Sequence, residues 1–514
     1  MIVEDKIFIG SNDNTEIYLL PKLANRHGLI AGATGTGKTI TLKALAESFS
    51  DLGVPVFLAD MKGDISGLSK QGELNEKINE RIDKYNLKEK GFNFRSYPVE
   101  FWDLFGEKGL PVRVTISQMG PTLLSKILNL TEAQEGILNI VFKVADAESL
   151  LLIDIKDLKS MINHVVENRT IYESQYGSIS TRSANTILRS LLSLEDHGGN
   201  SFFGEPALEL TDFIQCDDEG KGVINILDAV KLSLAPQLYS TFLLWMLTEL
   251  YETLPEVGDL EKPKFVFFFD EAHLLFDEMN PTFQKKIEQI VRLIRSKGVG
   301  LYFISQSPSD IPEDILAQLG NRIQHALRAY TPKDQKSIKA AAESFRPNPE
   351  LDTKEEISNL GIGEALVSLL DEDGVPSVVE KVDIIPPQSY TGGIDDGYRN
   401  ELINMSVYKQ KYMEALDRVS AYEVLLEKVE QVDSQSNAPQ ESSADTDASA
   451  STNNGLDFNP NQSTKTTKKS KNKSQSQKKD NSDLDKLAAT AANTMAREVS
   501  KHIVRGLFGQ MKLF

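Results

Sequence analysis

The sequence predicts an α/β fold with a mostly parallel central sheet, a helical insertion and a C-terminal helical extension. Short apolar segments of strand length alternate with segments of helical periodicity, as in a parallel sheet covered on both faces. Two of these segments, residues 54–60 (VPVFLAD) and 265–270 (FVFFFD), are continuous apolar runs that end in an acidic residue. From about residue 120 to 210 the alternation stops and helical spacing with cap-like starts predominates, which indicates the insertion.

Composition indicates the class of protein and the compartment in which it works. The chain has 514 residues, 40% apolar and 25% charged, which is typical of a globular protein with several structural units. No apolar run is long enough for a transmembrane helix, and the N-terminus lacks a signal-peptide pattern. The single cysteine, Cys216, excludes an internal disulfide and fits a reducing compartment, so we expect a cytoplasmic protein.

The net charge of −19 bears on nucleic acid as a partner. Proteins that bind nucleic acid passively usually have a basic surface, and this chain is acidic overall. A motor needs basic side chains only in a local loop or pore. The charge therefore weakens the case for DNA as the substrate without excluding it.

Residues 1–65 are expected to form the first part of the core: a strand, a turn, a helix over residues 38–52 and a second strand. That helix has Leu42, Leu45, Ala46 and Phe49 on one face. Residues 66–220 are expected to be the largely helical insertion, with one or two core strands, of which residues 112–116 (VRVTI) are one. Its predicted helices cover residues 131–146, 155–168 and 180–194.

Residues 221–390 are expected to complete the core. The predicted strands cover residues 222–227, 265–270, 300–306 and 323–327, and the predicted helices cover residues 236–251 and 281–297. Residues 365–370 and 378–382, joined by Asp373 and Gly374, indicate a closing hairpin.

The C-terminal extension follows Pro386 and Pro387. Residues 400–432 predict one charged amphipathic helix, and residues 433–482 have the polar, aromatic-poor composition of a disordered linker. The lysine-rich half of that linker is expected to be solvated, with contact to nucleic acid or to acidic surfaces as the alternative. Residues 483–514 predict a second amphipathic helix, which we expect to dock on a neighbouring subunit or a partner, with membrane-surface binding as the alternative.

One glycine-rich segment matches the phosphate-binding pattern G-x-x-x-x-G-K-[ST]: Gly32-Ala33-Thr34-Gly35-Thr36-Gly37-Lys38-Thr39. A strand precedes it and an amphipathic helix follows, so its backbone N–H groups can surround phosphates at a helix N-terminus. Lys38 is expected to bind the β- and γ-phosphates of ATP, and Thr39 to bind Mg²⁺. Thr41, in the first turn of the helix, is a further nucleotide-binding candidate.

Two acids at the end of the 265–270 strand predict the metal and hydrolysis site. Asp270 is expected to hold Mg²⁺, because ligands gather at the carboxyl ends of parallel strands, and Glu271 to activate the attacking water. Gln306, at the end of the 300–306 strand, is expected to sense the γ-phosphate or orient that water. The roles of His273 and Asp60 stay open: His273 either contacts the helix N-terminus or couples to the γ-phosphate, and Asp60 either supports the metal or forms a turn.

Four segments together resemble the HerA/FtsK class of P-loop ATPases, and most closely the YjgR-type proteins with a HerA-like helicase C-terminal domain: GATGTGKT, FLADMKGD, FVFFFDEAH and YFISQSPSDIP. The resemblance covers most of residues 1–390 and the C-terminal helix. It implies a RecA-like core with Glu271 as catalytic glutamate beside Asp270 and with Gln306 as polar sensor. It also implies a hexameric ring in which an arginine reaches the neighbour's nucleotide; Arg322 is the favoured candidate, and Arg295 and Arg328 are the others.

Two departures from that class affect the functional prediction. Too few residues precede Gly32 to form the N-terminal barrel of HerA, and the helical insertion is long. We expect an Mg-ATP-hydrolysing motor that moves DNA through a ring. The alternative is an ATP-dependent protein remodeller or secretion-type energiser, and a nucleotide-gated scaffold is disfavoured because Glu271 is present.

Overall fold

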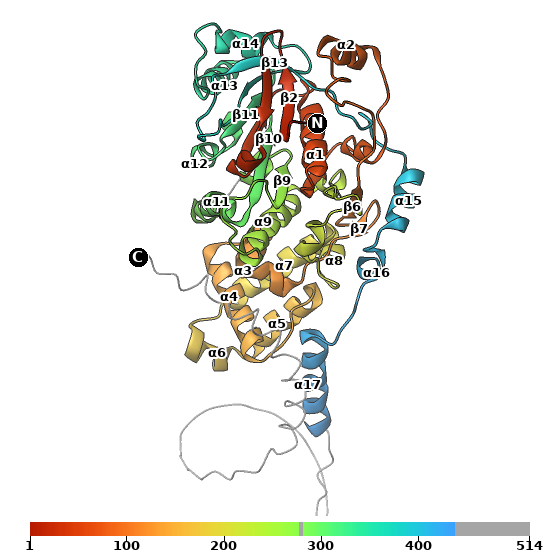
Figure 1. Cartoon of the computed structure of the whole chain (residues 1–514). Coiled ribbons are helices and arrows are strands. Elements are labelled where there is room, and N and C mark those ends of the chain that lie inside the picture. The colour runs from red at the N-terminus through yellow and green to blue at the C-terminus, as the bar shows by residue number, and fades with distance from the viewer. Residues whose placement is uncertain (277–280, 437–514) are drawn as a thin grey trace, which may run out of the picture. The chain divides into compact units, whose positions relative to one another are not determined.

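The structure, a computed structural model, describes residues 1–276 and 281–436, all within one compact unit (Figure 1). Residues 433–436 of the linker predicted over residues 433–482 belong to a helix instead, and the rest of that linker and the predicted helix over residues 483–514 lie outside the described residues. Among the described residues, no helix is long and apolar enough to cross a membrane.

One sheet of 13 strands forms the centre of the described chain. Its strands are β1 (Ile2–Val3), β2 (Lys6–Ser11), β3 (Glu16–Leu19), β4 (Gly28–Ala31), β5 (Val56–Asp60), β6 (Val99–Asp103), β7 (Leu110–Pro111), β8 (Ile224–Asp228), β9 (Phe265–Phe269), β10 (Val299–Ser305), β11 (Asn321–Gln324), β12 (Glu364–Ser368) and β13 (Glu380–Ile384). They are ordered β1-β2-β13-β12-β11-β4-β10-β9-β5-β8-β6-β7, with β3 paired to β2. Pairing is parallel from β11 to β7, and β12, β13 and the N-terminal strands add an antiparallel part. The predicted α/β fold with a mostly parallel sheet is therefore confirmed.

The register of the parallel strands brings the ends of several strands to one edge. Ala31, the last residue of β4, pairs with Ser305, the last residue of β10, and with Gln324, the last of β11. Phe269 at the end of β9 pairs with Phe303. The loops that follow β4, β9 and β10 consequently leave the sheet side by side, which is where ligands bind in open α/β sheets.

Helices cover both faces of the parallel sheet, which explains why every residue of β4, β5, β9 and β10 is buried. On one face lies α1 (Lys38–Asp51), whose Phe49 packs against Phe268 and Tyr302. On the other face Phe276 of α10 (His273–Phe276) packs against Phe303. Helix α10 also contacts α9 (Pro236–Thr253), which in turn contacts α11 (Pro281–Leu293).

The helical insertion is a bundle next to α9 (Figure 1). Its helices are α3 (Ile116–Ile127), α4 (Glu132–Ala147), α5 (Ile155–Glu167), α6 (Arg169–Tyr176), α7 (Thr181–Asp196) and α8 (Gly199–Phe202). The remaining helices of the core are α2 (Glu76–Lys84), α12 (Glu313–Leu316), α13 (Pro332–Glu343) and α14 (Thr353–Asn359).

The predicted strand over residues 112–116 is wrong. Strand β7 ends at Pro111, and α3 begins at Ile116 with Thr115 as its N-cap. The Thr115 side chain accepts from the Gln118 amide, while the Gln118 side chain accepts from the Thr115 amide at 3.1 Å. This capping box outweighs the strand preference of the β-branched run before it.

The single amphipathic helix predicted over residues 400–432 is also wrong. Three helices occupy this region: α15 (Asp396–Met405), α16 (Lys409–Tyr412) and α17 (Ala421–Ser436). Ser420 starts a new helix because its amide donates to the Glu423 carboxylate at 2.9 Å and its hydroxyl donates to the same group at 2.7 Å. The three helices contact different parts of the molecule. Helix α15 contacts β6, α16 contacts β7, and α17 packs against α5 of the insertion.

Candidate functional site

The phosphate-binding loop connects β4 to α1 and is fixed by the neighbouring strands. The Gly32 amide donates to the Ser305 carbonyl at 3.2 Å, and the Ala33 amide donates to the Ala326 carbonyl at 2.8 Å. Gly32 has a φ of 154°, and a Cβ atom at this position would lie 2.6 Å from Cβ of His325. Glycine is therefore required here for close packing as well as for backbone conformation.

Lys38 lies at the mouth of this loop. Its Nζ donates to the carbonyls of Gly32 and Ala33, the latter at 3.2 Å. Burial lowers the pKa of Lys38, and the negative charges of Glu271 and Asp270 act in the opposite direction. The lysine and the two acids therefore interact electrostatically, and Thr39 follows in the first turn of α1.

Asp270 and Glu271 follow directly after β9. Tyr239 of α9 donates its hydroxyl to the Asp270 carbonyl at 2.9 Å, and the Glu271 amide donates to the Asp270 carboxylate at 2.9 Å. Burial, and then the charge of Glu271, raise the pKa of Asp270 to about 7. A carboxylate whose charge is disfavoured in this way is stabilised by a nearby cation.

The Glu271 carboxylate lies between two side chains, one from the loop after β5 and one from the start of α10. Lys62 Nζ is 3.9 Å from Oε1, and His273 Nδ1 is 3.5 Å from Oε2. Oε2 is buried and has no hydrogen-bond partner among the described residues. The Glu271 backbone has a φ of 46°, in the left-handed region that costs energy for a non-glycine residue and is enriched at functional sites.

Gln306 follows β10, the strand between β4 and β9, and its side chain is exposed at the same edge. The turn that carries it is held by Asp310, whose carboxylate accepts from the Ser305 hydroxyl at 2.5 Å and from the Ser307 amide at 2.9 Å. The structure therefore places Gln306 between the phosphate loop and the two acids.

Asp60 has a structural role at the end of β5. Its two carboxylate oxygens accept four backbone amides of the following loop: Lys62 (3.3 Å), Gly63 (2.7 Å), Ile65 (3.1 Å) and Ser66 (3.1 Å). Of the two roles left open for Asp60, these contacts favour the turn, because the carboxylate is already occupied.

Thr41 does not face the nucleotide side of the loop. Its side chain is buried, and its hydroxyl lies 2.8 Å from Nε2 of His325, whose Nδ1 lies 2.9 Å from the Glu364 carbonyl. Because a carbonyl only accepts, Nδ1 carries the proton and Thr41 donates to Nε2. These contacts favour a structural role for Thr41, in which it supports the phosphate loop through His325, over the predicted role in nucleotide binding.

His325 was not among the sequence candidates, although it lies directly under the phosphate loop. Its Cε1 atom would be 3.3 Å from a Cβ on Gly37, and burial lowers its pKa to about 4, so the ring is neutral. The sequence placed it in the middle of the predicted strand over residues 323–327, whereas in the structure it follows the last residue of β11. Only the pairing of β11 with β4 shows that this end adjoins Gly32.

Arg322, the favoured arginine candidate, is held within its own chain. Its guanidinium donates to three backbone carbonyls, those of Leu319 (3.1 Å), Ser344 (2.8 Å) and Leu316 (3.0 Å). Arg322 pairs with Leu29, early in β11, and so lies away from the edge that carries the phosphate loop. These contacts favour a structural role for Arg322.

The other two arginine candidates are more exposed. Arg295, which precedes β10 in the chain, forms an ion pair with Asp259 at 3.4 Å. Arg328 follows β11 on the phosphate-loop edge, and it donates to the carbonyls of Ser358 and Leu360, the latter at 3.1 Å.

The residues near Lys38 fit a magnesium nucleotide. Thr39 offers a hydroxyl and Asp270 a carboxylate, and Mg²⁺ in such sites takes few protein ligands because phosphates and water supply the rest. The described residues contain no group of three or more His, Cys, Asp or Glu side chains that could hold a metal ion.

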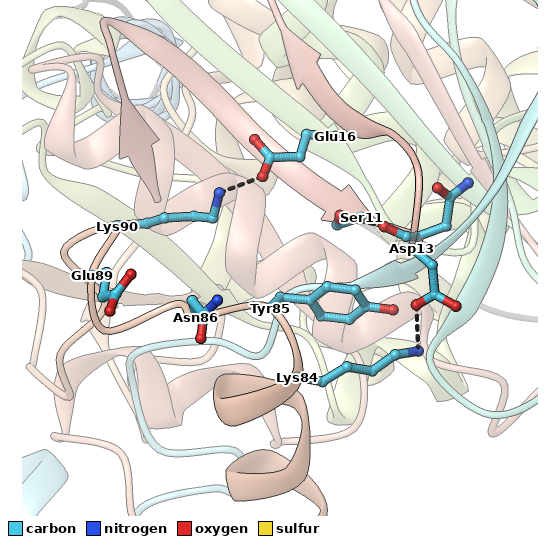
Figure 2. A pocket seen from close by; sticks show the side chains of 9 residues that line it. Ser11, Asp13, Glu16, Lys84, Tyr85, Asn86, Glu89 and Lys90 are labelled. Carbon is cyan, nitrogen blue, oxygen red and sulfur yellow. Dashed lines mark hydrogen bonds and ion pairs between the residues drawn. The ribbon is translucent and has the colours of Figure 1, made fainter.

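A separate cavity of about 410 Å³ lies beside β2 and α2 (Figure 2). Both of its lysines form ion pairs: Lys84 lies 3.1 Å from Asp383 and 3.8 Å from Asp13, and Lys90 pairs with Glu16. These pairs leave no concentrated positive charge for a ligand. The edge with Lys38 and Glu271 is the better candidate site.

Comparison with known protein families and sequences gives consistent matches. A family model described as Helicase HerA-like C-terminal matches residues 5–513. A DNA double-strand break repair helicase HerA of Sulfolobus acidocaldarius is 24% identical over 380 residues, covering 70% of this chain and 65% of that protein. A protein of the same description from Saccharolobus solfataricus is 24% identical over 372 residues, covering 71% of this chain and 66% of that protein. The chain thus spans less than two thirds of the length of these relatives.

Solved structures with a similar arrangement include two proteins. The bacterial conjugative coupling protein TrwB, lacking its first 70 residues, is 16% identical with a TM-score of 0.48, covering 74% of this chain and 90% of that chain. VirB4 of Thermoanaerobacter pseudethanolicus is 17% identical with a TM-score of 0.47, covering 75% of this chain and 97% of that chain.

Proposed function

This chain belongs to the Helicase HerA-like C-terminal family, and on that premise we propose that it is a motor ATPase that hydrolyses ATP with Mg²⁺ to move DNA. The membership confirms the resemblance stated from the motifs. One observation supports the activity most: Lys38, Asp270 and Glu271 converge at the carboxyl edge of β4 and β9. A phosphate loop facing two acids is the arrangement needed for nucleotide hydrolysis.

Nucleotide binding follows from the loop geometry. The amides of residues 32–39 and the N-terminus of α1 surround the β- and γ-phosphates, and Lys38 exchanges its carbonyl contacts for phosphate oxygens. Thr39 and Asp270 would hold Mg²⁺, which when bound neutralises phosphate charge. His325 and Thr41 keep the loop in place from beneath.

Hydrolysis uses Oε2 of Glu271, the oxygen that has no hydrogen-bond partner among the described residues. A water molecule that donates to Oε2 is oriented towards the γ-phosphorus, and Gln306 restricts its position from the adjacent strand. As the water oxygen forms a bond to phosphorus, its proton passes to Glu271 and the bond to the ADP oxygen breaks. Glu271 then releases that proton to solvent, so that ATP and water give ADP, phosphate and a proton.

DNA is the proposed substrate because the similar relatives are described as DNA repair helicases. By the same resemblance we propose a homo-hexamer in which an arginine of one subunit reaches the nucleotide of the next. Arg328 is the first of the three candidates to test, since it is exposed on the edge that carries the phosphate loop.

A protein-remodelling or secretion-type energiser is the second candidate, and the net charge of −19 favours it. Both candidates require the same ATPase site. They differ in what stimulates turnover, and that difference can be measured.

The test is the ATPase rate of the purified full chain with no DNA, with single-stranded DNA and with double-stranded DNA. We expect hydrolysis without DNA and stimulation by one DNA form, and a hexameric mass with a non-hydrolysable ATP analogue. Lys38→Ala serves as the control and should abolish turnover. Hydrolysis that ignores both DNA forms would favour the protein energiser, and wild-type turnover in Lys38→Ala would refute the site.

A further inference from the structure

We propose that Lys62 is a positioning residue that holds the catalytic carboxylate of Glu271, an inference that rests on the proposed ATPase function. The residue stands in the loop after β5, and β5 pairs directly with β9, which carries Glu271. No other lysine of the described residues forms an ion pair with this glutamate.

The two oxygens of Glu271 have different surroundings. Oε1 lies 3.9 Å from Lys62 Nζ, whereas Oε2 is buried without a hydrogen-bond partner among the described residues and lies 3.5 Å from Nδ1 of His273. The ammonium therefore attracts one oxygen and leaves the other to accept a hydrogen bond from the attacking water. Because the carboxylate can rotate about its side-chain bonds, a fixed charge on Oε1 restricts which way Oε2 points.

The position of Lys62 is fixed by the backbone that carries it. Asp60 accepts four amides of this loop, including the amide of Lys62 itself at 3.3 Å. On its outer side the loop packs against the segment before α15. The Ile394 amide donates to the Ser66 hydroxyl at 3.2 Å, and a Cβ on Gly393 would lie 2.4 Å from the Gly63 carbonyl.

Charge gives a second reason for a cation at this point. Glu271 lies next to Asp270, a like charge, and adopts a backbone conformation that costs energy. Lys38 donates to carbonyls of the phosphate loop, whereas Lys62 forms an ion pair with Glu271 itself, on the oxygen opposite to the one near His273. The side chain of Lys62 is 49% exposed and that of Glu271 is 16% exposed, so the lysine can reach the carboxylate from solvent.

The test compares Lys62→Met, which keeps the length and removes the charge, with Lys62→Arg, which keeps the charge. We expect Lys62→Met to lower kcat roughly tenfold or more, with KM for ATP within about twofold of wild type, because ground-state binding is not affected. Lys62→Arg should recover most of kcat. Lys70→Met is the matched control, since Lys70 is 46% exposed in the same region and pairs with Glu73 instead.

A double variant tests whether Lys62 acts through Glu271. In the Glu271→Gln background, Lys62→Met should cause no further loss of kcat, because the charge it positions is already absent. A raised KM with unchanged kcat would overturn the proposal in favour of direct phosphate binding, and equal effects in both backgrounds would overturn it as well. If wild-type protein does not hydrolyse ATP, the proposed function itself fails; if it does and Lys62→Met matches it, only the role of Lys62 fails.

Discussion

Replacing Asp60 with asparagine tests how the loop that carries Lys62 is held. The Asp60 carboxylate accepts four backbone amides, two on each oxygen. Asparagine keeps one accepting oxygen, and its NH₂ group faces two amides that it cannot accept. With about 1.5–3 kcal/mol for each hydrogen bond to a charged group, losing two costs roughly 3–6 kcal/mol in the free energy of opening this loop.

The lost hydrogen bonds affect the loop after β5 alone, so the assay must measure the opening of that loop rather than global unfolding. Hydrogen exchange at the amides of residues 62–66 should become faster by a factor of roughly 10² or more, since each 1.4 kcal/mol changes an equilibrium tenfold. Turnover should fall at least as far as in Lys62→Met, because the lysine is no longer fixed. Asp64→Asn is the matched control, since the Asp64 side chain caps no amide at the start of its 3-10 helix. Wild-type protection and wild-type turnover in Asp60→Asn would refute the reasoning.

Three further predictions concern the site and its supports. Glu271→Gln should bind ATP normally in an equilibrium binding assay and hydrolyse it roughly 10²-fold or more slowly, and unchanged turnover would remove Glu271 from the role of base. Arg322→Ala should lower the thermal unfolding temperature because three carbonyls lose their donor, with kcat of the folded protein retained; a stable but inactive variant would restore Arg322 as a trans arginine. Burial lowers the pKa of His27 and of His325 to about 4, below the unfolded value near 6.5, so their contribution to stability is present above about pH 6.5 and is lost as pH falls towards 4. Urea unfolding at about pH 7.5 and about pH 5 should show a loss of roughly 2 kcal/mol for each histidine, and a larger free energy of unfolding at the lower pH would contradict this.

The core elements were predictable because local patterns and packing agree in them. The strand around Phe268 is apolar throughout since α1 covers one face and α10 the other, and the glycine-lysine loop lies where a strand meets a helix. The strand predicted over residues 112–116 was wrong because two local patterns disagree there: the β-branched run favours a strand, and the Thr115 capping box starts a helix. In the extension, the single predicted helix is divided by the bonds of Ser420 to Glu423, which are also a local signal.

The partners of the candidate residues could not be predicted from single segments. Asp60 and Thr41 look like site residues in the sequence, yet one holds its own loop and the other donates to a histidine 284 positions away. Arg322 has the charge of a trans arginine, but folding surrounds it with carbonyls of its own chain. Such assignments depend on which groups occupy a side chain's hydrogen bonds, and distant segments decide that.

The sequence alone determined which chemistry is possible: a loop that can surround phosphates, a lysine to bind them, and two acids at the end of a buried strand. These follow from residue types and local spacing, which act over a few residues. The tertiary structure decided the rest, because strand order and parallel register set which loops meet. That order places Lys62 beside Glu271 and His325 beneath Gly32, although each pair is separated by more than two hundred residues along the chain.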